Sequence, residues 1–268
     1  MTYQKFLTDV LQVASDIANK HYGKVSSTTK TEDNNQVLTQ ADIEIGKFLI
    51  EEVQKSYPNY NVIDEETGII DKKSDYTWVI DPIDGTSNFA NGIPTYGIMI
   101  GLLNKDLPIS GGIALPFFSE IAVAEKGEGA FCNDEKLNVT SEENLLKELI
   151  AYGIDGHQEN PKLTKDEVEL LGKIILNIRN LRTSNSVFDV MMVAKGSYGG
   201  MLNRTSKIWD NVAQQVVLEE AGAIYTDFWG KPIDYSSPLQ KANANFTFCS
   251  ASQSLHRQLQ SIIHQPRT

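Results

Sequence analysis

The run Trp78-Val79-Ile80-Asp81-Pro82-Ile83-Asp84-Gly85-Thr86-Ser87-Asn88-Phe89 changes from apolar to polar after its third residue. Its first residues predict a buried strand, and the residues after Gly85 predict a helix. Two carboxylates at the end of a strand suit hard divalent cations, which prefer oxygen ligands. Free backbone N–H groups at a helix start bind phosphate readily. A metal site and a phosphate site only a few residues apart indicate phosphoryl chemistry.

Length and composition narrow the class of protein. With 268 residues, 41% of them hydrophobic, the chain can form one large domain or two closely packed ones with a full core. A formal net charge of −11 argues against a nucleic acid as partner, because basic surfaces bind phosphate backbones. The N-terminus lacks the pattern of a signal peptide, and no apolar run approaches the roughly 18 residues of a membrane span. We expect a soluble, cytoplasmic protein with no membrane partner.

The cysteines and histidines form no catalytic or zinc-binding pattern. Cys132 and Cys249 lie far apart in the sequence, which predicts two small buried residues in a reducing compartment. The histidines lie outside every motif, and we expect surface or structural roles for all of them. They are His21, His157, His256 and His264.

The N-terminal half predicts two helices followed by a run of strands. Apolar residues at helical spacing predict one helix over 3–22 and a second that begins after Thr39. The polar segment 23–37 between them is expected to be a mobile loop. From Asn61 to Ala130, short apolar runs separated by glycine and proline indicate strands in a largely antiparallel meander. These strands are expected at 62–63, 78–80, 96–103, 109–115, 120–124 and 129–131.

Helices and strands alternate in the C-terminal half. Strands are expected near 149–152, 199–202 and 246–250. Helices are expected near 165–177, 186–195, 211–221 and 252–263. Both kinds of element in both halves predict stacked α and β layers. A soft boundary near residue 150 separates an N-terminal α+β part, 1–150, from a C-terminal α/β part, 151–268, and we expect the two to pack as one compact unit.

Carboxylates in several segments are candidates for one metal site. Taken alone, most have a simpler interpretation: Asp42 as part of a capping box, Asp210 as a helix cap, and 64–66 as a solvated acidic turn. The 81–89 stretch favours a site by itself, because its proline and glycine fix a backbone path that presents both acids. An Asx-rich turn is the alternative there.

Taken together, these segments resemble the inositol monophosphatase family of magnesium-dependent, lithium-sensitive phosphomonoesterases. The matching segments occur in the family's order over nearly the whole chain. They are Val37-Leu38-Thr39-Gln40-Ala41-Asp42, Ile63-Asp64-Glu65-Glu66-Thr67-Gly68, the 81–89 stretch, the glycine-rich hairpin 127–137, and Trp209-Asp210-Asn211-Val212-Ala213 running into Glu220-Ala221-Gly222. The resemblance implies the family's α+β fold, a layered αβαβα sandwich, together with phosphoric monoester hydrolase activity and a homodimer.

The resemblance also implies a set of metal ligands. Glu65, Asp81 and the backbone carbonyl of Ile83 would hold a first Mg2+, and Asp81 would bridge to a second ion completed by Asp84 and Asp210. A third, weaker ion would lie near Glu65. Such sets agree with the habit of Mg2+ of using one or two carboxylates per ion and keeping several waters. Two ions can clamp the attacking and leaving oxygens of an in-line displacement.

The family's catalytic roles carry over to matching positions. The nucleophile would be a metal-activated water, which Glu65 and the Thr86–Asp42 pair would orient and deprotonate. Backbone N–H groups of Gly85 and Thr86 would hold the phosphate oxygens. Asp210 would help to protonate the leaving alkoxide through a bound water.

The segments expected to contact the leaving group depart from the family's pattern. A glutamate six residues before the Trp-Asp pair typically contacts the sugar ring, and this position is Asn203 here, which loses a charge-assisted contact. The usual Gly-Ser-Ala-Ala is Ser184-Asn185-Ser186-Val187 here. We expect hydrolysis to be retained and specificity to be broadened or moved. The expected substrate-binding residues are Asp84, Ser184, Asn185, Ser186, Asn203 and Asp210.

The substrate is expected to be a small-molecule phosphate monoester. Inositol 1-phosphate leads by resemblance, and the 2′-phosphate of NADP is the main rival. Fructose 1,6-bisphosphate and 3′-phosphoadenosine 5′-phosphate usually go with longer chains or extra motifs. Three nearby cations would favour a second anionic group, unless they are simply solvated. They are Arg182, Arg204 and Lys207.

Two other classes of protein are alternatives. A covalent aspartyl phosphatase of the haloacid dehalogenase type needs an aspartate two residues before its second acid, and that position is Pro82. A phosphate or metal sensor without turnover would predict the loss of a catalytic acid or of Thr86, yet every one of these positions is filled. Both alternatives are therefore disfavoured.

Overall fold

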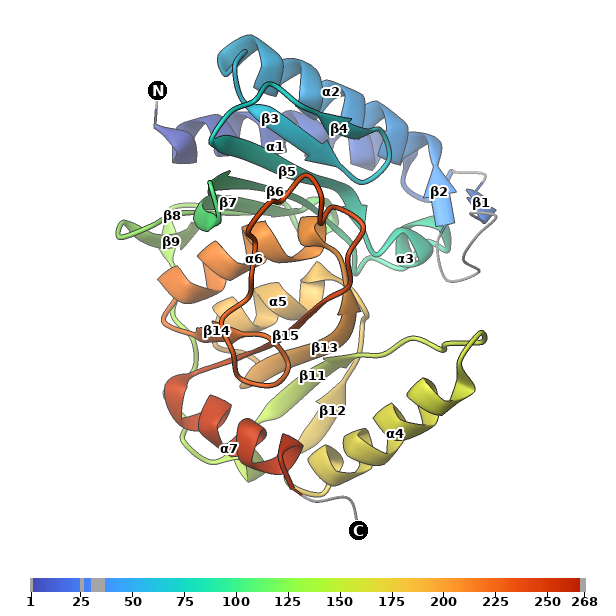
Figure 1. Cartoon of the computed structure of the whole chain (residues 1–268), viewed down its shortest axis with the longest axis vertical. Coiled ribbons are helices and arrows are strands. Elements are labelled where there is room, and N and C mark those ends of the chain that lie inside the picture. The colour runs from blue at the N-terminus through green and yellow to red at the C-terminus, as the bar shows by residue number, and fades with distance from the viewer. Residues whose placement is uncertain (1, 25–26, 30–36, 266–268) are drawn as a thin grey trace.

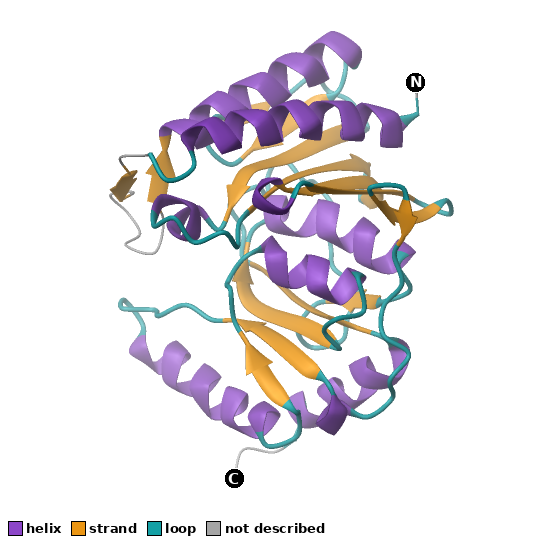
Figure 2. Cartoon of the chain, turned by 180° about the vertical axis from the view of Figure 1, so that it is seen from behind, coloured by secondary structure: helices purple, strands orange, loops and turns teal. Residues whose placement is uncertain are grey.

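Helices and sheets alternate in the order αβαβα, as Figures 1 and 2 show for the computed structural model. The structure describes residues 2–24, 27–29 and 37–265. The first layer holds α1 (Tyr3–His21) and α2 (Gln40–Ser56), the middle layer holds α5 (Val187–Ala194) and α6 (Ile208–Glu220), and the last layer holds α4 (Pro161–Ile175) and α7 (Gln253–Ile263). The predicted layered sandwich is confirmed.

The larger sheet has eight strands in the order β10-β9-β8-β7-β6-β5-β3-β4. Its strands are β3 (Asn61–Asp64), β4 (Gly68–Ile70), β5 (Tyr76–Asp84), β6 (Gly97–Asn104), β7 (Leu107–Leu115), β8 (Glu120–Glu125), β9 (Gly129–Cys132) and β10 (Glu135–Lys136). From β5 to β10 each strand is antiparallel to the next, so the predicted meander is confirmed. β3 joins it in parallel to β5.

The smaller sheet has five strands in the order β12-β11-β13-β15-β14. They are β11 (Leu149–Gly153), β12 (Asn180–Arg182), β13 (Gly200–Ser206), β14 (Ile224–Thr226) and β15 (Phe246–Ala251). The sequence predicted β11, β13 and β15 but not β12 and β14. These two are edge strands of three residues each, too short to show an alternation of apolar and polar residues.

The expectation of a loop over 23–37 is wrong in part. Ser27–Thr29 (β1) pairs in antiparallel fashion with Val37–Thr39 (β2), and α2 begins directly after β2. The rest of the segment, 25–26 and 30–36, lies outside the described residues. Among the residues that are described, no helix is long and apolar enough to cross a membrane.

The middle helices join the two halves of the chain. One buried cluster combines Met99 and Ile113 of the eight-stranded sheet with Val190 of α5 and Val216 of α6. The predicted boundary near residue 150 therefore falls between parts that share a core. Both cysteines are buried and free.

Candidate active site

β5 presents two aspartates on the same side of the sheet because its pairing with β6 is irregular. Asp81 pairs with Met99 and Asp84 pairs with Gly97, so β5 contains one residue more than its partner over this interval. In a regular strand, residues three apart point to opposite faces. The bulge removes this alternation and lets both carboxylates face the middle helix layer. The Asp-Pro-Ile-Asp sequence thus acts through backbone geometry.

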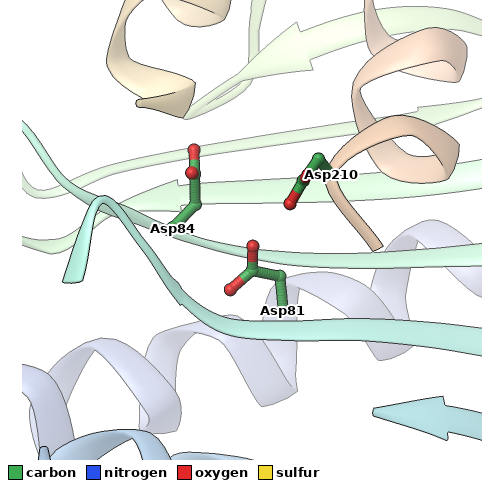
Figure 3. A group of neighbouring side chains, drawn as sticks. All are labelled: Asp81, Asp84 and Asp210. Carbon is green, nitrogen blue, oxygen red and sulfur yellow. The ribbon is translucent and has the colours of Figure 1, made fainter. Parts of the chain in front are cut away.

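Asp210 reaches the same place from α6. It lies at the third position of that helix, where its Oδ2 accepts a hydrogen bond of 2.6 Å from the backbone N–H of Lys207. Figure 3 shows its side chain converging with those of Asp81 and Asp84. One carboxylate oxygen from each of the three lies within 4.8 Å of the others.

The electrostatics of this acidic cluster fit a cation. Asp81 is 1% exposed, and its Oδ1 has no hydrogen-bond partner among the described residues. Burial, followed by the charges of Glu65, Asp84 and Asp210, raises the pKa of Asp81 well above its usual value. Desolvation and the charge of Asp210 do the same for Asp84, and desolvation raises the pKa of Asp210 to about 6. A divalent cation, which takes oxygen ligands, would compensate like charges so close together.

Of the two neighbouring acids at the end of β3, Asp64 stabilises the turn and Glu65 lines a cavity. Asp64 is buried, and its Oδ1 accepts bonds from the N–H of Glu66 and from the N–H and hydroxyl of Thr67. This closes the turn after β3. The turn places Glu65 at the wall of a cavity beside Asp81, so the segment is more than a solvated acidic turn.

Asp42 and Thr86 form the contact expected between α2 and the polar motif. Asp42 is fully buried, and its Oδ2 accepts bonds from the N–H and hydroxyl of Thr39 at 2.8 and 2.5 Å. Its Oδ1 lies 3.2 Å from Thr86 Oγ1, which is also 2.7 Å from the carbonyl oxygen of Ile83. Burial raises the pKa of Asp42 to about 6. The capping box and the contact with Thr86 therefore coexist.

Position 85 requires a glycine. Its φ is 83°, and it caps the short helix α3 (Thr86–Ala90). A Cβ there would lie 2.8 Å from Ser186 Cβ and 3.2 Å from the carbonyl oxygen of Thr95. The start of α3 is thus held directly against the segment 184–187.

A cavity of about 570 Å3 opens between two walls. The acidic wall consists of Glu65, Asp81, Asp84 and Asp210, and the polar wall lies opposite, on the side of the five-stranded sheet. Val187, the first residue of α5, donates its N–H to Asp84 Oδ2, and Ser186 caps the same helix. Asn185 has a φ of 54° and donates from Nδ2 to Asp155 Oδ1 at 2.9 Å. Asn203 Oδ1 accepts the N–H of Thr205 at 2.7 Å. The polar wall therefore offers amides and hydroxyls.

A model of the inositol monophosphatase family matches residues 2–265. The chain belongs to this family. A fructose-1,6-bisphosphatase/inositol-1-monophosphatase of Aquifex aeolicus is 30% identical over 226 residues, which cover 82% of this chain and 83% of that relative. A Nus factor SuhB of Haemophilus influenzae is 32% identical over 218 residues, 80% and 81% of the two chains. The structure of the extragenic suppressor protein suhB from Bartonella henselae superposes with a TM-score of 0.87 at 24% identity over 98% of each chain, which shows the shared fold.

The site residues that this family membership suggested gather around the cavity. Nearly all of them line it, and two lie just behind the lining: Asp42 behind Thr86, and Ser184, whose carbonyl oxygen accepts a bond from Asn88. The residues that line it are Glu65, Asp81, Ile83, Asp84, Gly85, Thr86, Asn185, Ser186, Asn203 and Asp210.

The loop after β11 also lines the cavity and was not predicted. It contributes Asp155 and His157, and the Nε2 of His157 lies 3.3 Å from the hydroxyl of Thr205. The expectation of a surface or structural role for His157 therefore misses its position on the cavity wall. The signal in the sequence that could have found it is its position directly after the expected strand near 149–152, because loops at the carboxyl ends of strands often carry sites in α/β sheets.

Two of the three cations considered for a second anionic group do not line the cavity. The guanidinium of Arg204 lies over the rings of Phe228 and Trp229, 5.6 and 5.5 Å from their centroids. Arg182 donates to the carbonyl of Leu181. Lys207 does border the cavity, with its Nζ 2.8 Å from the carbonyl oxygen of Asn243.

Proposed function

We propose that the protein is a Mg2+-dependent phosphomonoesterase that hydrolyses inositol 1-phosphate-type substrates by direct attack of a water molecule. The observation that carries this proposal is the convergence of the Asp81, Asp84 and Asp210 carboxylates on one wall of a cavity. The buried Oδ1 of Asp81, which has no hydrogen-bond partner among the described residues, supports a cation as its ligand. The name of the Aquifex relative, fructose-1,6-bisphosphatase/inositol-1-monophosphatase, supports a sugar or polyol phosphate as the substrate class.

The residues present would divide between two or three Mg2+ ions. Glu65, Asp81 and the carbonyl of Ile83 would hold one, and Asp81, Asp84 and Asp210 a second, with a weaker third near Glu65. When bound, these ions lower the pKa of water and balance the negative charge that develops on the phosphate. The acidic wall supplies carboxylates from different elements, β5 and α6, which fixes their mutual arrangement.

The chain's own groups would orient the water and the phosphate. Thr86 can give its hydroxyl proton to Asp42, and its oxygen then accepts a proton from the attacking water. The raised pKa of Asp42, about 6, suits a group that accepts a proton near neutral pH. The first N–H groups of α3 have no partner inside the helix, so those of Gly85 and Thr86 would bind phosphate oxygens. Asp210 would hold the water that protonates the leaving oxygen.

The polar wall would bind the rest of the substrate. Asn185, Ser186 and Asn203 offer hydrogen bonds suited to the hydroxyls of a polyol, and His157 extends this surface. NADP and the bisphosphates carry further negative charge. Neither Arg182 nor Arg204 lines the cavity to meet that charge, and the Nζ of Lys207, which borders the cavity, is bonded to the carbonyl oxygen of Asn243. These substrates therefore rank below inositol 1-phosphate. The 2′-phosphate of NADP remains the second candidate because Asn203 replaces the family's acidic residue.

Three further expectations stay predictions. They are a homodimer, a cytoplasmic location and the absence of a nucleic-acid partner. The non-enzymatic alternative is a site that binds metal and phosphate without turnover. The Haemophilus relative is named Nus factor SuhB and not a phosphatase, so a non-enzymatic role stays the alternative. The filled catalytic positions favour the enzyme.

The test is phosphate release with Mg2+, with and without a chelator. The substrates are inositol 1-phosphate, NADP, fructose 1,6-bisphosphate and 3′-phosphoadenosine 5′-phosphate. We expect chelator-sensitive release that is fastest with inositol 1-phosphate. Fastest release from NADP would replace the substrate assignment and keep the reaction class. Binding of Mg2+ and phosphate without release from any ester would contradict the enzyme.

A further inference from the structure

Two glycines in neighbouring strands form a bare patch under α6. Gly101 of β6 and Gly111 of β7 are direct cross-strand partners. A Cβ on Gly111 would lie 2.4 Å from the carbonyl oxygen of Ala213 and 3.0 Å from its Cα. A Cβ on Gly101 would lie 2.7 Å from Ala213 N and 2.8 Å from Val212 Cγ1. Most of these are backbone atoms of α6, which no change of rotamer can move aside. The helix lies closer to the sheet than it could over any other pair of residues.

This close approach occurs one turn from the acidic cluster. Ala213 follows Asp210 by three residues in the same helix, and β6 is the direct neighbour of β5, which carries Asp81 and Asp84. We propose that Gly101 and Gly111 are positioning residues: they let α6 rest on the sheet so that Asp210 reaches the carboxylates of β5. The inference rests on the proposed role of Asp210 as a Mg2+ ligand.

The C-terminal end of α6 is held by hydrogen bonds to the eight-stranded sheet. Glu220, the last residue of the helix, accepts hydrogen bonds from the N–H groups of Gly127 and Gly129 at 2.9 and 2.8 Å. Its C-terminal end is thereby tied to the hairpin between β8 and β9. The N-terminal half is held by hydrogen bonds from Asn211 to Ser206 Oγ and to the carbonyl oxygen of Lys207, and a methyl group added beneath Ala213 would push this half away from the sheet. Asp210 lies in that half.

Gly112 supplies a matched control in the same strand. Its side-chain direction is toward the opposite face of the sheet, where a Cβ would lie 2.7 Å from Leu11 Cδ1 and 3.3 Å from Leu7 Cβ of α1. G112A therefore adds the same methyl group to the same strand and crowds α1, far from α6. It separates a loss of stability from a displacement of Asp210.

The experiment measures Mg2+ affinity by titration calorimetry on metal-free protein, with circular dichroism and thermal melting to verify folding. The variants are G101A, G111A, G112A and D210N, and D210N combined with each of the first two. We expect G101A and G111A to weaken Mg2+ binding about tenfold or more. G112A should lower the melting temperature and keep the parent affinity. Added to D210N, the glycine changes should weaken binding no further, because both act through one ligand.

Two results would overturn this inference and leave the proposed metal site standing. One is parent-like Mg2+ affinity in folded G101A and G111A while D210N binds weakly, and the other is equal weakening in G112A. If D210N itself keeps the parent affinity, the proposed metal site fails and the inference with it. Should G111A not fold, G101A decides, because one of its closest contacts is a Val212 methyl group that can turn aside.

Discussion

The two walls of the cavity are built in different ways. The acidic wall consists of carboxylates fixed by a strand bulge in β5, by the turn after β3 and by the first turn of α6. The polar wall consists of side chains on loops and at the end of β13 that hold one another, such as Asn185 with Asp155 and His157 with Thr205. Groups in the first wall are set by the backbone and can tolerate little change. Groups in the second can be exchanged while the fold persists, so we expect chemistry to depend on one wall and substrate choice on the other.

The largest effect is expected from Asp84→Asn. This change removes one of the converging carboxylates while keeping the shape of the side chain. Turnover should fall about a hundredfold or more, because the reacting groups lose their common geometry. The metal-free variant should melt at a higher temperature than the parent, since one of several mutually repelling acids is gone. Phosphate release and thermal melting measure the two effects, and exposed Asp106→Asn is the control. Near-normal turnover would contradict the metal assignment.

Thr86→Ala should have the next largest effect. It removes the hydroxyl between Asp42 and the carbonyl of Ile83 and leaves the carboxylate cluster intact. We expect kcat to fall about a hundredfold, the usual scale for losing an acid–base group, with little change in Mg2+ affinity. Thr86→Ser keeps the hydroxyl and should restore most of the activity. A large loss of Mg2+ affinity in T86A, with kcat unchanged at saturating metal, would show that Thr86 serves the metal site instead.

A substitution in the polar wall should change which substrate is preferred and leave kcat largely unchanged. Asn203→Glu restores an acidic group opposite the acidic wall. The ratio of kcat/KM for inositol 1-phosphate over NADP should rise roughly tenfold, equivalent to about 1.4 kcal/mol from a charge-assisted hydrogen bond. Arg204→Lys is the control, because Arg204 lies in the same strand but packs over aromatic rings. An unchanged ratio in N203E would mean that the leaving group binds elsewhere.

The smallest effect concerns a titratable group outside both walls. His256 of α7 is buried, with its Nε2 2.9 Å from the hydroxyl of Thr226, and burial lowers its pKa. The unfolded chain therefore binds this proton more readily than the folded protein, so stability falls as pH drops through the usual histidine range. His256→Gln should flatten the decline of melting temperature below neutral pH without altering kcat. If the melting temperature of H256Q falls as steeply below neutral pH as that of the parent, other titratable groups cause the decline.

Sequence reasoning reached the acidic wall more completely than the polar one for a physical reason. The acids of β5 lie in one continuous stretch that predicts a site by itself, and Asp210 joined them through the family resemblance. Asp155 and His157 enter the cavity only because β11 and β13 are parallel neighbours, which no local pattern indicates. The Gly101–Gly111 pair likewise exists only once the register of β6 and β7 is known. The strands that the sequence did not predict have two or three residues each, too few for a periodic pattern; they are β1, β2, β4, β10, β12 and β14.

The most direct test of the central claim is to locate the metal. Crystals of the protein would be soaked with Mn2+, which prefers the same oxygen ligands as Mg2+ and gives an anomalous signal. We predict anomalous peaks within coordination distance of Asp81, Asp84 and Asp210, and their loss from the position shared with Asp84 in the D84N variant. Peaks only elsewhere on the molecule, or none at saturating Mn2+, would contradict the assignment of the acidic wall as a metal centre.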